Sequence, residues 1–558
     1  MTQSRTSDLW WKNAIVYCLD AETFLDSDGD GHGDLAGLTE RLDYLAGIGV
    51  TCVWLMPFFP SPSRDDGYDI TDYYGVDPQL GSLGDFAVLV RAARDRGLRV
   101  VVDLVINHTS DQHPWFQAAR SDPDSKYRDY YVWRDEPQDE PDAEPVFPDA
   151  EDSVWTYDDE AEKWYLHHFY SHQPDLNIAN PEVREELAKV AGFWLELGVD
   201  GFRVDAVPFL LETGGIPGAE DLDPHHMLRD LRAFITRRRG SAMLLGEVNL
   251  AGKELRRYFG DEDGDELNML FNFPVMQSMY LSLARQDAEP LKETLEQLPA
   301  IPSDSQWANF ARNHDELTLD KLSDDERREV FEAFGPEEDM QLFGRGLRRR
   351  LPPMVDGDER RIRLVYSLVF TLVGTPVLFY GEEIGMGENL AIEGRLSVRS
   401  PMQWTDGPTA GFSTAEPAEL FRPVVEGEFG PAEVNVAEQR RDSESLLNWM
   451  EKIIRRRRET PEFGWGEMTT LATGDSAVLA HRCDWEGRTV LAVHNFAGEA
   501  RTVIIELGEI ASEESSSELK DLLRSRPVPA ISGGDIELDL EPYDYRWFRV
   551  EAGGLDSP

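Results

Sequence analysis

The chain has 558 residues, 41% of them hydrophobic, which is enough for a large core and more than one domain. It carries 55 lysines and arginines against 106 aspartates and glutamates, so its formal net charge is −51 at pH 7. Such a surface repels phosphate backbones and excludes nucleic acid as a partner. We interpret the charge as a means of solubility, with adaptation to a salty cytoplasm as the alternative.

The N-terminal residues show no basic stretch followed by an apolar one, so no secretory signal is expected. The longest apolar stretch, 365–379, is interrupted by Ser367 and is too short to predict a membrane span. Cys18, Cys52 and Cys483 are isolated thiols without metal-ligand spacing, as is typical of a reducing compartment. We therefore expect a cytoplasmic protein without a membrane partner, and leave its oligomeric state open.

Short apolar segments alternate with helical patterns in the first part of the chain. Strands are predicted at 14–19, 50–55 and 98–106, with helices at 35–47 and about 83–96 between them. This rhythm predicts a parallel sheet covered by helices.

The rhythm breaks at 107–172, a stretch rich in Asp, Pro, Tyr and Trp that predicts a small inserted domain. Alternation resumes with a helix at 182–197. Further strands are predicted at 201–204, 243–247, 269–273, 308–313 and 376–380. The total is eight, the number that closes a TIM-type (β/α)8 barrel.

From residue 463 onward the pattern changes to Val, Leu and Thr strands separated by Gly and Asp turns, which predicts an all-β sandwich domain. The predicted organisation is a first barrel part, an inserted domain B, a second barrel part and a C-terminal β domain, at 1–106, 107–172, 173–462 and 463–558.

Three of the predicted strands lead to a carboxylate: Asp205, Glu247 and Asp315. The carboxyl ends of barrel strands meet on one face, so these acids are expected to share one site. Glycosidases use a pair of carboxyl groups to break a glycosidic bond. For any one of them taken alone, capping of a helix is the alternative.

Four stretches resemble, in order, the signatures of glycoside hydrolase family 13, the α-amylase family. They are 103–108 (DLVINH), 201–205 (GFRVD), 246–247 (GE) and 313–315 (NHD). The stretch 173–177 (QPDLN) resembles the marker of the oligo-1,6-glucosidase-like group within it. This resemblance implies a retaining enzyme, whose two reacting carboxyl groups lie roughly 5 Å apart.

By this resemblance Asp205 is the nucleophile, Glu247 the general acid/base, and Asp315 the residue that holds hydroxyl groups of the sugar. Arg203 shares a strand face with Asp205 and is expected to keep it ionised, because a neighbouring cation lowers the pKa of a carboxyl. Glu247 must instead stay protonated near neutral pH.

His108 and His314 lie within the signatures, and the resemblance implies that they donate hydrogen bonds to sugar hydroxyls; each taken alone would be a structural histidine. The stretch 65–69 (DDGYD) resembles a glucose-binding loop in which Asp65 grips the sugar and Tyr68 stacks on it. Arg399 resembles the arginine that pairs with Asp65. A closed pocket would favour short substrates, whereas an ordinary turn and a surface arginine are the alternative.

Phe147 and Phe169 are candidate aromatic walls contributed by the inserted domain, with core packing as an equal alternative. Gln173 begins the group marker and is assigned to substrate binding by the same resemblance.

The stretch 26–34 (DSDGDGHGD) places alternating acids around glycines, a pattern suited to Ca²⁺ or Mg²⁺. It is not an EF-hand, because Gly37 occupies the twelfth position. The family resemblance implies a similar structural metal loop with the ligands Asp26, Asp28, Asp30, the carbonyl of His32, and Asp34. A solvated acidic turn is the alternative.

Several segments are similar to the trehalose synthases of this family, which interconvert maltose and trehalose: 107–116, 130–133, 172–177, 312–319, 374–387 and 398–412. The stretches 246–249 (GEVN) and 17–22 (YCLDAE) depart from that group. The expected substrates are therefore maltose and trehalose, with hydrolysis of short α-glucosides as the alternative reaction. A non-catalytic sugar-binding relative is disfavoured, since all three carboxylates are present.

Overall fold

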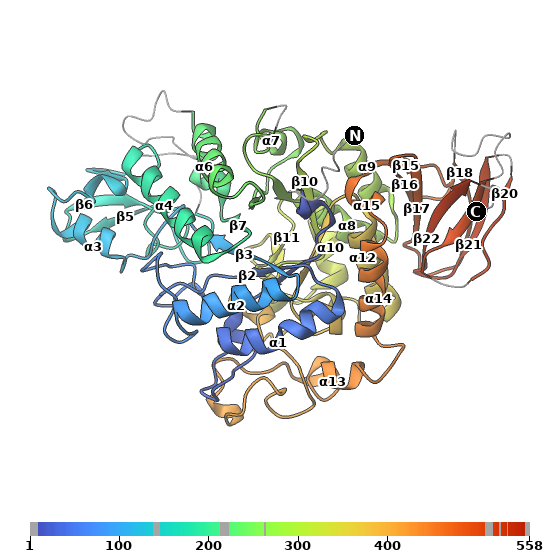
Figure 1. Ribbon diagram of the computed structural model, residues 1–558, viewed down its shortest axis with the longest axis horizontal. Coiled ribbons are helices and arrows are strands. Elements are labelled where there is room, and N and C mark those ends of the chain that lie inside the picture. The colour runs from blue at the N-terminus through green and yellow to red at the C-terminus, as the bar shows by residue number, and fades with distance from the viewer. Residues whose placement is uncertain are drawn as a thin grey trace.

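The computed structural model describes residues 9–137, 145–211, 223–261, 264–507, 517–523, 526–532 and 534–552. At its centre eight parallel strands close into a barrel (Figure 1). In order around the barrel they are β1 (Val16–Leu19), β2 (Cys52–Leu55), β3 (Arg99–Leu104), β7 (Gly201–Val204), β8 (Met243–Gly246), β9 (Met269–Phe271), β10 (Gln306–Phe310) and β14 (Thr375–Phe379). The predicted TIM-type barrel is confirmed.

The barrel strands are buried almost throughout, and every residue of β2, β7 and β8 is buried. Their sequences are continuous apolar runs because helices cover one face of each strand and the packed barrel interior covers the other. The strand predicted at 308–313 begins and ends earlier, at Gln306 and Phe310. Asp315 therefore lies in the loop after β10 and not at the strand end.

Helices surround the barrel, and their ends follow local sequence signals. In α4 (Pro181–Leu197), the side chain of Asn180 caps the first turn and Gly198 ends the last one at φ 110°. The other long helices are α1 (Leu35–Ile48), α2 (Leu83–Asp95), α6 (His225–Arg238), α8 (Phe273–Arg285), α10 (Asp324–Phe334), α12 (Glu359–Thr371) and α14 (Leu446–Arg458). Shorter ones are α5 (Val207–Leu210), α7 (Gly252–Arg257), α9 (Glu289–Gln297), α11 (Leu351–Met354), α13 (Val436–Gln439) and α15 (Glu462–Trp465).

The segment between β3 and α4 forms a separate lobe at one end of the long axis (Figure 1). It contains helix α3 (Pro114–Ser121) and a three-stranded antiparallel sheet in the order β4 (Trp133–Arg134), β6 (Lys163–Leu166) and β5 (Trp155–Asp158). This lobe leaves the barrel at the carboxyl end of β3, where it can contribute to a site at that face.

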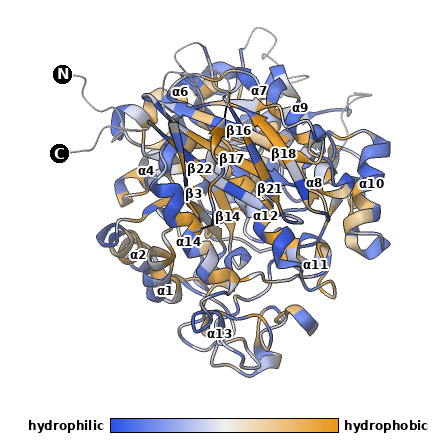
Figure 2. Ribbon diagram, turned by 90° about the vertical axis from the view of Figure 1, so that its right-hand side faces the viewer, coloured by the Kyte–Doolittle hydropathy of each residue, from blue (hydrophilic) through white to orange (hydrophobic). Residues whose placement is uncertain are grey.

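The C-terminal β domain lies at the opposite end of the molecule (Figure 1). Its first sheet has the order β15 (Glu467–Leu471), β16 (Val478–Trp485), β17 (Arg488–Asn495), β22 (Tyr545–Ala552) and β19 (Ser517–Asp521). Its second has the order β18 (Arg501–Glu506), β21 (Asp535–Leu540) and β20 (Ile531–Ser532). Apolar residues of both sheets, coloured orange in Figure 2, form one buried cluster, so the predicted all-β domain is confirmed.

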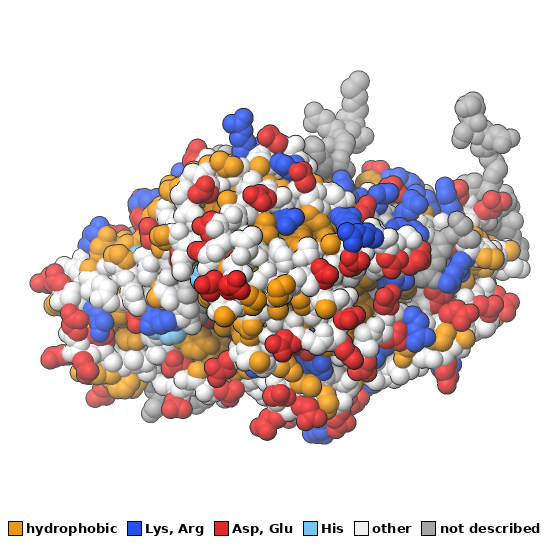
Figure 3. Space-filling model, turned by 90° about the horizontal axis from the view of Figure 1, so that it is seen from below, with side chains coloured by type: hydrophobic (Ala, Val, Ile, Leu, Met, Phe, Trp, Pro, Cys, Tyr) orange, Lys and Arg blue, Asp and Glu red, His pale blue; other side chains and the backbone are white. Residues whose placement is uncertain are grey.

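Acidic side chains are spread over the face shown in Figure 3, with basic ones between them. Within the described ranges, none of the helices combines the length and the apolar character needed to cross a bilayer. All three cysteines are buried and free.

Candidate active site

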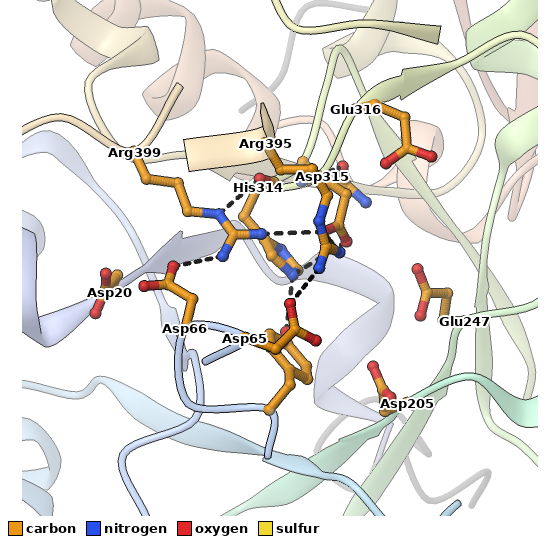
Figure 4. A network of polar contacts seen from close by, with 12 residues as sticks. Asp20, Asp65, Asp66, Asp205, Glu247, His314, Asp315, Glu316, Arg395 and Arg399 are labelled. Carbon is orange, nitrogen blue, oxygen red and sulfur yellow. Dashed lines mark hydrogen bonds and ion pairs between the residues drawn. The ribbon is translucent and has the colours of Figure 1, made fainter. Parts of the chain in front are cut away.

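Asp205, Glu247 and Asp315 lie at the carboxyl-end face of the barrel and surround an open space (Figure 4). Asp205 directly follows β7, Glu247 directly follows β8, and Asp315 comes from the loop after β10. All three line one cavity of about 380 Å³. The structure thus brings together the three acids that the sequence predicts to meet.

Arg203 joins the two acids assigned to the chemistry. Its Nη1 donates to Asp103 and to Asp205 at 2.5 Å each, and its Nη2 donates to Glu247 Oε2 at 2.7 Å. The Arg203 side chain is only 1% exposed, so these contacts are shielded from water. One cation therefore serves three carboxylates, an excess of negative charge where positive charge develops during glycoside cleavage.

Burial raises the pKa of both acids. The pKa of Asp205 rises to about 6 by desolvation, with Arg203 opposing the shift. Desolvation raises the pKa of Glu247 to about 7, again against Arg203. Arg203 lowers the pKa of Asp205 as expected, but desolvation raises it by more. Near neutral pH Asp205 is still mostly ionised while Glu247 is partly protonated, as a nucleophile and a general acid require.

Asp315 is held by two arginines on one oxygen. Arg395 Nη1 donates to Asp315 Oδ1 at 2.6 Å, and Arg399 Nη2 donates to the same oxygen at 3.0 Å. Burial opposes ionisation of Asp315, but the charges of Arg395 and Arg399 lower its pKa well below the usual range. Asp315 is thus a permanent anion that can accept hydrogen bonds from sugar hydroxyls.

The predicted pair of Asp65 and Arg399 is not formed. Asp65 Oδ1 instead accepts from Arg395 Nη2 at 2.5 Å, whereas Arg399 Nη1 donates to Asp66 Oδ2 at 2.5 Å. Arg399 is fully buried and does not line the cavity, while Asp65 and Arg395 both do. The residue that closes the pocket beside Asp65 is therefore Arg395, which the sequence analysis missed.

Tyr68 lines the cavity, and its hydroxyl lies 2.7 Å from His314 Nε2. The two rings stack with a 4° angle between their planes. Burial lowers the pKa of His314 well below its usual value, so the ring is neutral. In this structure His314 lies behind Tyr68 and within 3.2 Å of Asp315 Oδ2, and it is not among the cavity-lining residues.

The inserted lobe supplies an aromatic wall. Phe147 and Phe169 both line the cavity, with ring centroids 5.9 Å apart, and the guanidinium of Arg395 lies 4.8 Å from the ring of Phe147. His108 also lines it, with its ring 5.0 Å from Phe169. Gln173 is fully buried behind this wall and donates to Asp65 Oδ2 at 3.0 Å, so its contact is with Asp65.

Comparison with known proteins agrees with this geometry. Residues 19–333 and 348–466 match the family described as the alpha amylase catalytic domain, and residues 487–549 match the sucrose hydrolase-like C-terminal domain. The chain belongs to the α-amylase family. The resemblance inferred from the four signatures is therefore confirmed, and the chain is a glycoside hydrolase family 13 enzyme.

Relatives within the α-amylase family differ in their named activities. The trehalose synthase of Pimelobacter sp. (strain R48) is 39% identical over 97% of this chain and 96% of its own length. The oligo-1,6-glucosidase of Bacillus cereus is 29% identical over 97% of this chain and 99% of its own length. The crystal structure of the trehalulose synthase MutB from Pseudomonas mesoacidophila MX-45 has a TM-score of 0.75 at 28% identity, covering 97% of this chain and 99% of that one.

The acidic loop of residues 26–34 follows β1, and none of its residues lines the cavity. The carboxylate oxygens of Asp26, Asp28 and Asp34 lie within 4.8 Å of one another. Asp30 Oδ1 accepts from the backbone N–H of His32 at 2.8 Å. These three of the five predicted ligands are of the kind that a hard divalent cation prefers, and the metal stays a prediction.

Three residues of this site were not assigned from the sequence. Asp103 opens the first signature and contacts Arg203, and Asp66 follows Asp65 in the loop 65–69. Arg395 lies four residues before Arg399, within the 3-10 helix η7 (Gly394–Val398). The available signal for Asp103 was its place in a family signature; for Arg395 and Asp66 it was proximity in sequence to a residue already assigned.

Proposed function

We propose that the chain interconverts maltose and trehalose by moving a glucosyl unit within its closed site. The observation that carries this proposal is the closed end of the cavity, where Arg395 joins Asp65 at 2.5 Å and Asp315 at 2.6 Å. A pocket closed beside the non-reducing glucose suits a disaccharide and stops a polymer from passing through. The 39% identity to a trehalose synthase over nearly the whole chain supports the reaction type.

In the first step the Asp205 carboxylate attacks the anomeric carbon of the non-reducing glucose of maltose. Glu247 donates its proton to the glycosidic oxygen as the carbon–oxygen bond breaks. Glucose is released into the cavity, and a glucosyl ester remains on Asp205. Arg203 contacts both acids, so it can stabilise Glu247 as that residue becomes a carboxylate.

In the second step the released glucose turns within the cavity and presents its anomeric hydroxyl to the ester. Glu247 takes the proton from this hydroxyl, and the oxygen attacks the anomeric carbon while the bond to Asp205 breaks. The two displacements retain the configuration of the transferred unit and form trehalose without consuming water. Entry of water at this point would give glucose.

Retention of the released glucose requires a covered site, and the inserted lobe provides cover. Val146 and Phe147 of this lobe line the cavity. Arg345 Nη2 donates to the carbonyl of Val146 at 2.9 Å and pairs with Glu316 at 3.2 Å. This bridge ties the inserted lobe to the barrel loops on the other side of the cavity and limits the exchange of glucose with solvent.

Incubation with maltose followed by separation of the products tests the proposal. Trehalose should be the main product with glucose as a minor one, and labelled free glucose should enter trehalose poorly, because the acceptor is retained. Asp205→Asn serves as the control and should form neither product. Formation of glucose alone at every degree of conversion would make the enzyme an α-glucosidase, with the roles of the three carboxylates unchanged.

We propose further that Asp26, Asp28, Asp30, Asp34 and the carbonyl of His32 hold a structural Ca²⁺ or Mg²⁺. When bound, the ion would screen the mutual repulsion of these acids and fix the loop after β1, without entering the chemistry. The three carboxylates gathered in this loop support the proposal. We also propose a cytoplasmic location, which the three free, buried thiols support.

A further inference from the structure

Behind Asp315, on the side away from the cavity, lies a row of buried charges of alternating sign. It runs from Asp315 through Arg399, Asp66 and Arg422 to Asp20 and Glu22 (Figure 4 shows the part from Asp315 to Asp66, with Asp20). Arg399, Asp66 and Arg422 do not line the cavity. The row reaches the cavity at Asp315, which does line it.

Arg399 is fixed at three points. Its Nε donates to the carbonyl of His314 at 2.9 Å, its Nη1 to Asp66 at 2.5 Å, and its Nη2 to Asp315 at 3.0 Å. The guanidinium plane is rigid, so two fixed ends determine where the third points. The contact with Asp66 thereby sets the direction from which Arg399 approaches Asp315.

Asp66 binds two arginines, one on each carboxylate oxygen: Arg399 on Oδ2 and Arg422 on Oδ1. Its backbone adopts a left-handed conformation with φ 52°, which costs free energy in a residue other than glycine. The side chain is only 5% exposed. The two arginines compensate the burial of this carboxylate and hold the turn in place.

Arg422 secures the far end of the row. Its Nη1 donates to the carbonyl of Arg399 at 3.1 Å, and its Nη2 donates to Asp66. Asp20 and Glu22, just after β1, lie 4.0 and 3.9 Å from its guanidinium. Arg422 therefore contacts both the backbone of Arg399 and the carboxylate that orients its side chain.

We propose that Asp66 and Arg422 are positioning residues for the reaction: they hold Arg399 in place, and Arg399 holds Asp315. The two arginines that bind Asp315 therefore have different roles. Arg395 lines the cavity and closes it beside Asp65, whereas Arg399 supports Asp315 from behind. The inference depends on the retaining chemistry of the site and not on whether trehalose or glucose is formed.

The test measures maltose consumption, counted as the sum of all products, so its outcome is independent of the product ratio. Asp66→Asn should lower kcat about 10- to 100-fold, the range for losing one hydrogen bond to a charged group, while KM changes less than about threefold. Asp521→Asn is the matched control. It breaks the buried Asp521–Arg546 pair, 2.8 Å long, in the C-terminal domain and should leave kcat unchanged.

A double-mutant cycle separates positioning from a general loss of structure. If Asp66 acts through Arg399, adding Asp66→Asn to Arg399→Gln should change kcat less than about twofold. An equal fall of kcat in both backgrounds, or an unchanged kcat in the single variant, would overturn the proposal. If Asp66→Asn does not fold, Arg422→Lys keeps the charge, loses one of two contacts, and should show the same dependence on Arg399 with a smaller fall.

Discussion

The acids on two sides of one cavity have pKa values that are shifted in opposite directions. On the catalytic side, Glu247 shares Arg203 with two other carboxylates, and its pKa rises to about 7. On the opposite side, Asp315 accepts from two arginines, each of which binds only one other carboxylate, and its pKa falls well below the usual range. The two side chains are similarly exposed, 23% for Glu247 and 16% for Asp315, so burial does not explain the difference. The number of cations per carboxylate decides which acid can exchange a proton and which stays charged.

The largest effect on turnover is expected from replacing Asp205. Asp205→Asn keeps the shape of the side chain but removes the nucleophile, so the turnover of maltose should fall by about four orders of magnitude or more. The unfolding temperature should remain close to that of the parent, because little packing is lost. Near-normal turnover in a folded variant would contradict the assignment of Asp205.

Removing Arg395, on the side of the cavity with Asp65 and Asp315, should have a smaller effect. Arg395→Ala removes the ion pairs to Asp65 and Asp315 and should reduce kcat/KM for maltose by about 10- to 100-fold. This fall corresponds to about 1.4–2.7 kcal/mol, which is in the range for hydrogen bonds to a charged group. Assays with maltose and starch check this result. The parent enzyme should turn over disaccharides far better than starch, and efficient random cleavage of starch by the parent would reject the closed pocket.

The pH dependence of kcat/KM tests the difference between the pKa values of these acids without a mutation. Activity should fall as the pH drops through about 6, where Asp205 becomes protonated, and as it rises through about 7, where Glu247 loses its proton. Asp315 should add no limb in this range, because its pKa lies far lower. In Glu247→Gln the high-pH limb should disappear from the residual activity, and its persistence would assign that limb to another group.

The smallest effect on the chemistry should come from removing the metal. If the loop at residues 26–34 binds Ca²⁺ or Mg²⁺, a chelator should lower the unfolding temperature, because a ligand bound only to the folded state stabilises it by mass action. The rate at low temperature should hardly change, since none of these residues lines the cavity. Asp28→Asn should remove the response to chelator, and identical melting curves with and without chelator would favour a solvated acidic turn.

The barrel and its three acids could be predicted because each depends on a local pattern. Buried strands read as apolar runs, and the acids lie at or just beyond the ends of three of them, so the topology of the barrel brings them together. The inserted lobe between β3 and α4 could be predicted because the alternation of strands and helices stops there in the sequence. The pairing of the two arginines was not predictable in the same way.

Which of the two arginines meets Asp65 depends on short-range geometry. Arg395 and Arg399 both belong to the segment around η7, and Asp65 and Asp66 are adjacent, so several pairings agree with the sequence. Asp66 takes a left-handed turn and accepts Arg422 from a distant loop, and this combination draws Arg399 behind the pocket. A contact made by three segments far apart in sequence leaves no periodic signal.

The three carboxylates around Arg203 also determine which inhibitors the site should favour. Asp103, Asp205 and Glu247 outnumber the single guanidinium between them, so the centre of the site holds uncompensated negative charge whenever Glu247 is ionised. A small ring that carries a protonated nitrogen where the sugar has its anomeric carbon would bring a full positive charge to that place. Such basic sugar mimics should bind more tightly than neutral ones of the same shape, and their advantage should grow as the pH rises and Glu247 loses its proton.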